Sequence, residues 1–237
     1  SHVGSLIGEE IGTGGQINNV YASGNVKGEN QVGGLVGLNN SSINSSYANV
    51  NVIGLSDLGG LVGQNWGNIN NTYATGDVSS TTTSGFTGGL LGSNYAGNVE
   101  HSYSSGVING GASLVGSLAG AVFGGSSISN SFWDQTIAPS TGVTGSGGTL
   151  INVLGKTTTE LMTQSTYSSA TWDFANTWWM IDGQTRPMLK MEYNTNIATT
   201  HQLQMMTTNL AADYSLVANL YFNSDSALWS NLSLIHI

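Results

Sequence analysis

The sequence contains no cysteine, which excludes a small fold held together by disulfide bonds. Charged residues make up 7% of the chain, whereas a typical soluble protein has roughly 25%. Lys and Arg together number four (Lys27, Lys156, Arg186 and Lys190), and the net charge is −9. Because nucleic acids and anionic membranes both require a basic surface, neither is expected as a partner. No apolar run approaches the roughly 20 residues of a spanning helix, so we expect no membrane insertion in this segment.

Glycine, by contrast, is abundant, with 34 residues, and hydrophobic residues still account for 39% of the chain. A disordered low-complexity chain would lack this apolar fraction. Neutral polar side chains on a glycine-rich, β-branched backbone favour stacked short strands over a helical bundle.

A short phrase recurs five times, with two apolar residues following a Gly-Gly or Gly-Ser pair. Its central leucine falls at positions 6, 35, 61, 90 and 118, in steps of 29, 26, 29 and 28 residues. A period of this length is typical of stacked repeat arrays. The five copies are Val3-Gly4-Ser5-Leu6-Ile7-Gly8, Val32-Gly33-Gly34-Leu35-Val36-Gly37, Leu58-Gly59-Gly60-Leu61-Val62-Gly63, Thr87-Gly88-Gly89-Leu90-Leu91-Gly92 and Val115-Gly116-Ser117-Leu118-Ala119-Gly120.

Each copy is followed by a polar corner, a second strand of the type Ile-x-Asn-x-Tyr, and a third strand near a Gly-x-Val. Three strands per repeat predict an all-β parallel solenoid of about five coils over residues 1–133. We expect the leucines to form one inward column. We expect an aromatic column beside it, formed by Tyr21, Tyr47, Tyr73, Tyr103 and Phe132.

Two details of the coil follow less directly from the sequence. The paired glycines are expected to turn corners at positive φ and to let neighbouring coils approach closely. Strict alternation along the second strand would place Asn19 and Asn71 inside, as a buried asparagine ladder. A bulge in that strand is the alternative, and the sequence leaves both open.

The pattern changes after Trp133. Residues 134–193 are expected to form a small aromatic-rich α+β cap, with a helix near Leu161 introduced by the Thr157 to Glu160 capping box. We expect residues 155–190 to fold back over the open end of the solenoid. Trp172, Trp178 and Trp179 could form the core of this cap or a platform that stacks on glycans.

A further unit is expected over residues 194–231, as the start of another β-helical module. Thr199 to Gln202 is a second capping box, and residues 213–217 are expected to form a strand without a partner in the chain. The last six residues, 232–237, are interpreted as a translated sequencing adapter. We interpret the chain as a fragment of a longer gene.

The repeated phrase resembles the GLUG motif, in five copies over residues 3–133. Such repeats occur in large bacterial surface and secreted proteins, including filamentous-haemagglutinin-like adhesins and the non-catalytic parts of some IgA-cleaving proteases. The resemblance implies a right-handed β-solenoid and an exported, cell-surface or secreted role, but no particular activity. The first and fifth copies depart from the motif with Ser5 and Ser117 in place of the second glycine.

Parallel β-helices also build polysaccharide lyases and hydrolases, so an enzyme is a second candidate class. A lyase needs a base and cations for the sugar carboxylate, and Lys27 is the one Lys or Arg inside the repeats. A glycosidase needs two carboxylates that face one cleft. No convincing pair stands out among Glu9, Glu10, Glu29, Asp57, Asp77, Glu100 and Asp134.

His101 has no second histidine or cysteine near it in sequence, so no metal site is expected. We therefore predict no catalytic, cofactor-binding or metal-binding residues and no enzyme activity. The sequence favours a structural and adhesive module of an exported bacterial cell-surface protein, monomeric within a longer chain. Its partner would be a protein or glycan on a host or neighbouring cell. The alternatives are a carbohydrate-active β-helix enzyme and a non-catalytic spacer of a large secreted protease.

Overall fold

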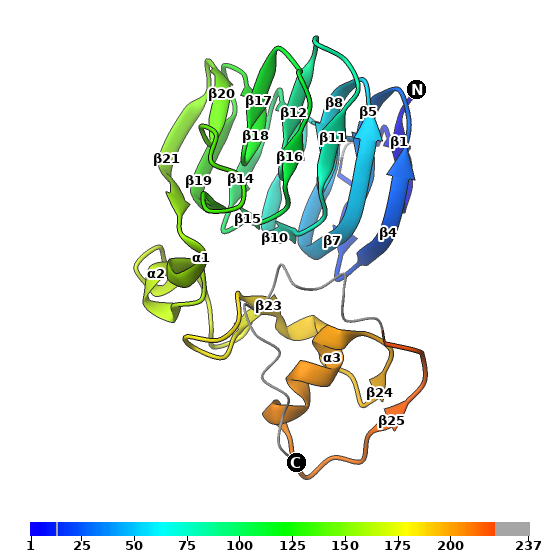
Figure 1. The fold of residues 1–237 in the computed structure, drawn as a ribbon, viewed down its shortest axis with the longest axis vertical. Coiled ribbons are helices and arrows are strands. Elements are labelled where there is room, and N and C mark those ends of the chain that lie inside the picture. Colours follow the sequence, from blue (N-terminus) through cyan, green and yellow to red (C-terminus); the bar gives the residue numbers. More distant parts are fainter. Residues whose placement is uncertain (13, 221–237) are drawn as a thin grey trace. The chain divides into compact units, whose positions relative to one another are not determined.

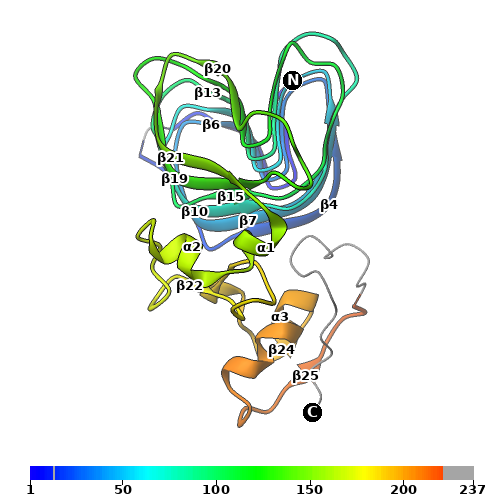
Figure 2. The ribbon, with the colours of Figure 1, turned by 60° about the vertical axis from the view of Figure 1, so that its left-hand side comes forward.

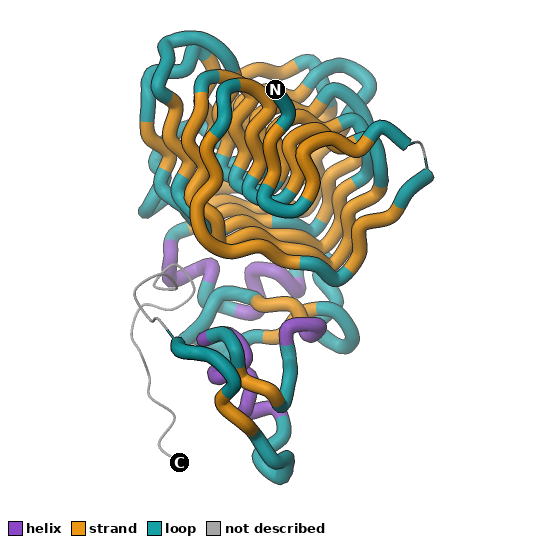
Figure 3. Tube along the Cα trace, turned by 90° about the vertical axis from the view of Figure 1, so that its right-hand side faces the viewer, coloured by secondary structure: helices purple, strands orange, loops and turns teal. Residues whose placement is uncertain are grey.

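The first 158 residues wind into a parallel β-solenoid, in which each coil stacks on the one before it (Figures 1 and 3). The computed structural model describes residues 1–12 and 14–220. The chain divides into two units, and the second unit begins at Thr159. The repeats predicted this solenoid, because one coil buries little apolar surface until its neighbours cover it.

Three parallel sheets run along the solenoid, and each strand in them pairs with an equivalent strand of a neighbouring coil. The first sheet contains β1 (Val3–Gly4), β5 (Asn30–Gly33), β8 (Ser56–Gly59), β12 (Phe86–Gly88) and β17 (Leu114–Gly116). The second contains β2 (Ile7–Glu10), β6 (Val36–Asn39), β9 (Val62–Asn65), β13 (Leu91–Asn94), β18 (Ala119–Val122) and β20 (Val143–Ser146).

The third sheet carries the second and third strands of each repeat, which merge into one long strand in the second coil. It contains β3 (Gln16–Asn18), β4 (Tyr21–Lys27), β7 (Ser42–Gly54), β10 (Ile69–Ala74), β11 (Val78–Ser80), β14 (Asn98–Glu100), β15 (Tyr103–Ser104), β16 (Ile108–Asn109), β19 (Ser127–Asp134) and β21 (Thr149–Lys156).

The leucine column lies inside the solenoid as predicted, with one exception at its end. Leu35, Leu61, Leu90 and Leu118 are fully buried in the main apolar core. Leu6, in the first coil, is 48% exposed, because the coil edge on its other side is open. Full burial of one such side chain stabilises the fold by roughly 1.5–3 kcal/mol.

The aromatic column is also confirmed. The Tyr21, Tyr47, Tyr73 and Tyr103 rings stack with centroids 5.1, 4.8 and 5.1 Å apart. Phe132 is buried and pairs in register with Tyr103. Each centroid spacing is close to the separation of about 4.8 Å between neighbouring strands, so the column follows the stacking of the coils.

The paired glycines permit close approach, but the prediction that they turn at positive φ was wrong. None of the glycine pairs of the repeated phrase lies at positive φ. A Cβ atom on Gly34 would instead overlap the carbonyl oxygen of Gly60 in the next coil, and it would lie 3.1 Å from the Cβ of Ala48 in the third sheet. The outline of each coil is indented rather than round, as the oblique view of the stack shows (Figure 2). A side chain at Gly34 would separate these segments.

The second strand is bent at a left-handed residue in every coil, so its side chains do not alternate strictly between the inside and the outside. The residue two positions after the first aliphatic residue of this strand has φ between 46° and 56° in all six cases, namely Asn19, Ser45, Asn71, His101, Asn130 and Asn152. Asn19 is exposed and Asn71 half-buried, so the buried asparagine ladder expected there does not form. Small hydroxyl side chains turn inward one residue later. Of these, Thr72 Oγ1 and Ser102 Oγ lie within hydrogen-bond distance of each other, at 2.9 Å.

The solenoid continues past Trp133 into a sixth coil. β20 pairs in parallel with β18, and β21 pairs with β19 from Ser127 to Asp134. Residues 134–156 therefore extend the solenoid, whereas the sequence placed them in the capping segment. The Trp133 indole lies where a Cβ atom on Gly142 or Gly155 would be, so two glycines make room for the ring.

The second unit packs short helices and two-stranded ribbons around aromatic residues. Its elements are α1 (Thr158–Leu161), α2 (Gln164–Ser168), β22 (Trp178–Trp179), β23 (Met188–Leu189), the 3₁₀ helix η1 (Lys190–Glu192), β24 (Asn196–Ile197), α3 (Thr200–Met205), η2 (Met206–Thr208) and β25 (Ser215–Leu216). The helix expected near Leu161 is present, and the capping box at Thr199 and Gln202 forms, with a 3.2 Å bond from the Gln202 amide to Thr199 Oγ1.

The strand expected over residues 213–217 is present as β25, but it has a partner. β25 pairs in parallel with β24, through Asn196 with Ser215 and Ile197 with Leu216. The expected module at 194–231 is described up to residue 220, and residues 232–237 lie outside the described part. Over the described residues, the helices are all too short or too polar to cross a bilayer.

Candidate functional site

A row of aromatic side chains lies on the outside of the solenoid, at the corner that follows the second sheet. Trp66 stacks on Tyr95 with ring centroids 4.9 Å apart, and Tyr95 stacks on Phe123 at 4.3 Å. Phe86, from the first sheet, meets Phe123 edge-on at 5.7 Å. We call Trp66, Tyr95 and Phe123 the outer aromatic row.

A buried asparagine ladder holds this row from beneath. Asn39, Asn65 and Asn94 are fully buried, and each occupies the position immediately before the corner residue. Asn39 Nδ2 donates to Asn65 Oδ1 at 2.7 Å, and Asn65 Nδ2 donates to Asn94 Oδ1 at 2.9 Å. Since a buried amide must find partners, the ladder fixes the path of each corner.

Backbone hydrogen bonds also join each corner to the corner of the preceding coil. The amide of Trp66 donates to the Asn39 carbonyl at 2.8 Å, and the amide of Tyr95 donates to the Asn65 carbonyl at 2.8 Å. Each corner residue therefore stands one coil above the last. This registry places the three rings in a single stack.

Trp66 is the end of the row, and its indole is 45% exposed. The equivalent corner position in the preceding coil is Asn40, whose amide donates away from Trp66, to the Glu10 carbonyl at 2.8 Å. Tyr95 thus covers one face of the indole, while the other face has only a short polar neighbour. The arrangement offers a flat apolar surface that is fixed from behind.

Polar side chains join the first and second sheets next to the row. Asp57 lies at a left-handed position, with φ 51°, and its Oδ1 accepts a bond from Ser93 Oγ at 3.2 Å. Burial raises the pKa of the Asp57 carboxyl, and the bond from Ser93 partly opposes this rise. Burial and the Asp57 charge together raise the pKa of the Tyr95 hydroxyl.

Most of the carboxylates that were considered for catalysis bind neighbouring groups within the solenoid. Glu9 pairs with His2 at 2.8 Å, and Glu10 accepts from Ser41 Oγ at 2.5 Å. Asp77 accepts from the Val107 amide at 2.8 Å. The Asp134 carboxylate likewise accepts from the Thr136 amide at 3.0 Å and from Thr158 Oγ1 at 2.8 Å. These contacts connect coils or close turns, which is a structural use of the acidic groups.

His101 occupies the left-handed position of its coil, with Nδ1 3.3 Å from Asn70 Oδ1. Within residues 1–12 and 14–220, no group of three or more His, Cys, Asp or Glu side chains is placed to hold a metal ion. In the second unit, Glu192 Oε2 and His201 Nδ1 form a buried pair 2.5 Å apart, and Glu192 Oε1 accepts from the Leu189 amide at 2.7 Å.

The tryptophans of the second unit form a core and not an open platform. Trp172 and Trp178 are buried, and their ring centroids lie 4.4 Å apart. Tyr167 packs on Trp172 at 4.7 Å. Trp179 is half-buried. The two buried rings therefore cannot stack on a glycan while this unit is folded.

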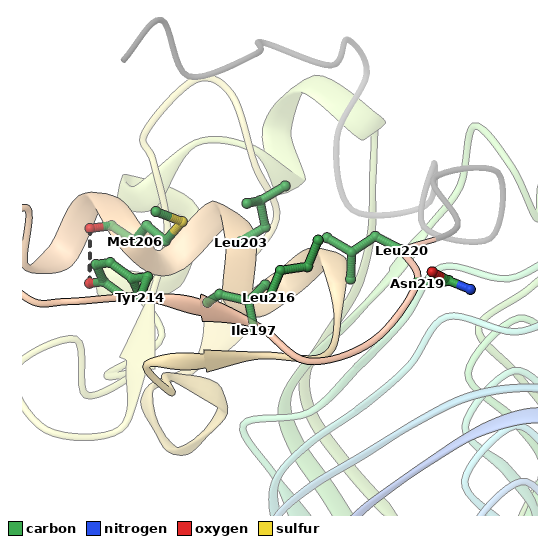
Figure 4. A pocket seen from close by; sticks show the side chains of 7 residues that line it. All are labelled: Ile197, Leu203, Met206, Tyr214, Leu216, Asn219 and Leu220. Carbon is green, nitrogen blue, oxygen red and sulfur yellow. Dashed lines mark hydrogen bonds between the residues drawn. The ribbon is translucent and has the colours of Figure 1, made fainter.

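The second unit also contains an open apolar pocket of about 810 Å³ (Figure 4). Tyr214 stands at one end, where its hydroxyl donates to the Met206 carbonyl at 3.3 Å and lies 3.1 Å from the Tyr193 hydroxyl. Burial and Tyr193 raise the pKa of Tyr214 to about 12. The lining residues are Ile197, Leu203, Met206, Tyr214, Leu216, Asn219 and Leu220.

The outer aromatic row was not among the features predicted from the sequence, although its residues follow the spacing of the repeat. The corner position reads Asn40, Trp66, Tyr95 and Phe123, at spacings of 26, 29 and 28 residues that follow the repeat. Aligning the copies would have placed these residues in one column. The change of residue type from copy to copy hides the column from a search for a conserved phrase.

One copy of the repeat matches a known family motif. Residues 54–79 match the GLUG motif, and this range covers the third coil from Gly54 to β11. The chain is 40% identical over 108 residues to a Gly-rich membrane protein of Evansella cellulosilytica. That alignment covers 44% of this chain and 12% of the relative, so the chain spans a small part of that protein's length. No solved structure matches the chain.

Proposed function

We propose that this chain is a structural and adhesive module of an exported bacterial cell-surface protein, in which the solenoid extends or presents binding regions. One observation carries the proposal. The coils stack in register through three continuous sheets, so each added repeat lengthens the rod by about 4.8 Å without a new fold. A scaffold of this kind separates a binding region from the surface that anchors it.

The composition and the relative support the same role. A neutral polar exterior with 7% charged residues gives no basic surface for nucleic acid. The GLUG match and the similarity to a Gly-rich membrane protein fit a protein that is exported and held at the cell surface. Its partner would be a protein or glycan on a host or neighbouring cell.

Labelling of intact cells tests the location. Antibodies raised against residues 1–158 should label unpermeabilised cells of the organism that carries the gene, and added protease should remove the signal. A cytoplasmic protein serves as the control for lysis. Labelling that requires permeabilisation would contradict the proposal.

Adhesion needs a separate measurement. The purified chain, immobilised on beads, should retain the beads on host or neighbouring cells, and soluble chain should compete for the same sites. Beads coated with another acidic protein of similar size provide the control. Equal retention of the two kinds of bead would leave a purely structural role.

A further inference from the structure

We propose that Trp66 and its corner form a binding platform for neutral sugar units, so that the adhesive partner of this module is a neutral glycan. This inference rests on the proposed adhesive function and specifies the chemistry of its ligand. It is argued from the exposure of Trp66, from the way the ring is held, and from the groups around it.

The indole face is available and rigid. Trp66 is 45% exposed, although a tryptophan is normally buried in a solenoid that has an apolar core available. Tyr95 stacks on its covered face with an interplanar angle of 7°, and Phe123 supports Tyr95 in turn. A ring fixed in this way loses little conformational freedom when a ligand stacks on it.

The free face points toward the preceding coil, where the corner residue is small. Asn40 directs its amide to the Glu10 carbonyl, and Trp66 remains 45% exposed. A pyranose ring presents a flat face of C–H groups and an edge of hydroxyl groups. The indole suits that face, while the side-chain amide of Asn68, an exposed residue two positions later in the same corner, suits the edge.

Charge selects the class of sugar. Two acidic groups lie near this corner: the Glu10 carboxylate, which accepts from Ser41 Oγ beside Asn40, and Asp57, whose charge acts on Tyr95. All four Lys and Arg residues lie elsewhere in the sequence, at 27, 156, 186 and 190, and the chain carries a net charge of −9. Uronic and sialic acids would therefore be repelled, because like charges at an interface oppose binding. A neutral hexose or N-acetylhexosamine avoids this repulsion.

The test uses the purified chain with cellohexaose, maltohexaose, laminarihexaose and N-acetylchitohexaose, measured by calorimetry and by tryptophan fluorescence. At least one of these neutral oligosaccharides should bind. Trp66→Ala should weaken that binding about tenfold or more, and Trp66→Tyr should weaken it less, because it keeps a ring.

Tyr21→Ala is the matched control. Tyr21 is also 45% exposed and also stacks on one neighbour, but it lies on the third sheet. Its replacement should leave sugar binding unchanged. Far-UV circular dichroism and the melting temperature confirm that each variant is folded.

Three results with the oligosaccharides would overturn the inference. These are no binding of any of the four oligosaccharides, binding that Trp66→Ala leaves unchanged, and equal binding of trigalacturonate. Tighter binding of choline than of the sugars would also overturn it, by indicating a cation site on the ring. Labelling of intact cells is independent of these results, so failure here is distinguishable from failure of the surface location.

Discussion

The side-chain amide of Asn65 links its own coil to the coils on either side, since it accepts from Asn39 Nδ2 at 2.7 Å and donates to Asn94 Oδ1 at 2.9 Å. The same amide also closes its own corner, because it donates to the Gly67 carbonyl at 2.7 Å and accepts from the Gly67 amide at 3.3 Å. All three asparagines are fully buried. One side chain thus satisfies groups in three successive coils.

Asn65→Ala should therefore lower the free energy of unfolding by about 2–4 kcal/mol, because it leaves several buried polar groups without partners. Urea denaturation followed by circular dichroism measures the effect. Asn25→Ala is the control. Asn25 is exposed and accepts from Asn51 Nδ2 at 3.1 Å, so its removal should cost within about 0.5 kcal/mol. Equal losses in the two variants would contradict the structural role of the ladder.

Leu61→Asp should unfold the solenoid or abolish soluble expression, because it places a carboxylate in the fully buried leucine column. Leu6→Asp changes the same position of the repeat in the first coil, where the side chain is 48% exposed. That variant should stay folded. Far-UV circular dichroism and melting temperatures decide between them, and a Leu61→Asp protein that melts like the unchanged chain would show that the column is misassigned.

The sequence was sufficient to predict the solenoid and its two main columns. Leu35, Leu61 and Leu90, like Tyr47, Tyr73 and Tyr103, recur at one period, and a period fixes which residues stack. Buried positions with a constant residue type are therefore predictable from one sequence.

Features that depend on backbone conformation or on variable positions were not predictable in the same way. The left-handed residue of the second strand varies among Asn, Ser and His. The paired glycines are required because a Cβ atom would overlap the next coil, and not because the backbone there has a positive φ. The sixth coil lacks the repeated phrase, because Thr141-Gly142-Val143 stands where the other coils have Gly-Leu-Val or a close variant. The corner position that carries the outer aromatic row varies in residue type, from Asn40 through Trp66 and Tyr95 to Phe123.

The left-handed position gives a third prediction. Ser45 has φ 48°, so Ser45→Val should destabilise the fold by about 1–2 kcal/mol, while Ser45→Gly should be neutral or stabilising. Ser79→Val is the control, since Ser79 lies in β11 and is absent from the positive-φ positions. Valine suits a strand, so that change should be tolerated. Equal effects of valine at the two positions in urea melts would argue against a strained backbone at Ser45.

Asp57→Asn should stabilise the chain at neutral pH. Burial raises the pKa of Asp57 above its ordinary value of 3.8, so the charged form is disfavoured in the folded state. The stability that this group contributes is fully present below pH 3.8 and is lost as the pH rises through the raised folded pKa. Asparagine keeps an oxygen for Ser93 and tolerates the left-handed backbone.

The advantage of Asp57→Asn should accordingly shrink as the pH falls from 7 toward 3.5. Melting temperatures of the two proteins across that range measure it, and groups other than residue 57 cancel in the comparison. An Asn variant that is less stable at pH 7, or an advantage that grows on acidification, would contradict the assigned direction of the pKa shift.

Truncation tests how the solenoid ends. A chain that stops at Trp133 loses β20 and β21, and this would expose Ile128 and Phe132, which pair in register with Leu150 and Leu154. Free strand edges and apolar side chains on one surface form a template for pairing between molecules, so this chain should form oligomers or fibres. A chain that stops at Tyr193 should stay monomeric.

A third chain, stopping at Thr158, keeps all six coils and separates two explanations for that difference. The sequence predicts that residues 155–190 cover the end of the solenoid. On that basis the chain ending at Thr158 should also associate, because β21 pairs with β19 and, within residues 1–12 and 14–158, has no strand on its other side. Size-exclusion chromatography with light scattering gives the mass of each chain. A stable monomer from the chain ending at Thr158 would mean that the sixth coil is sufficient to close the stack, and that the aromatic unit after it folds as an independent module.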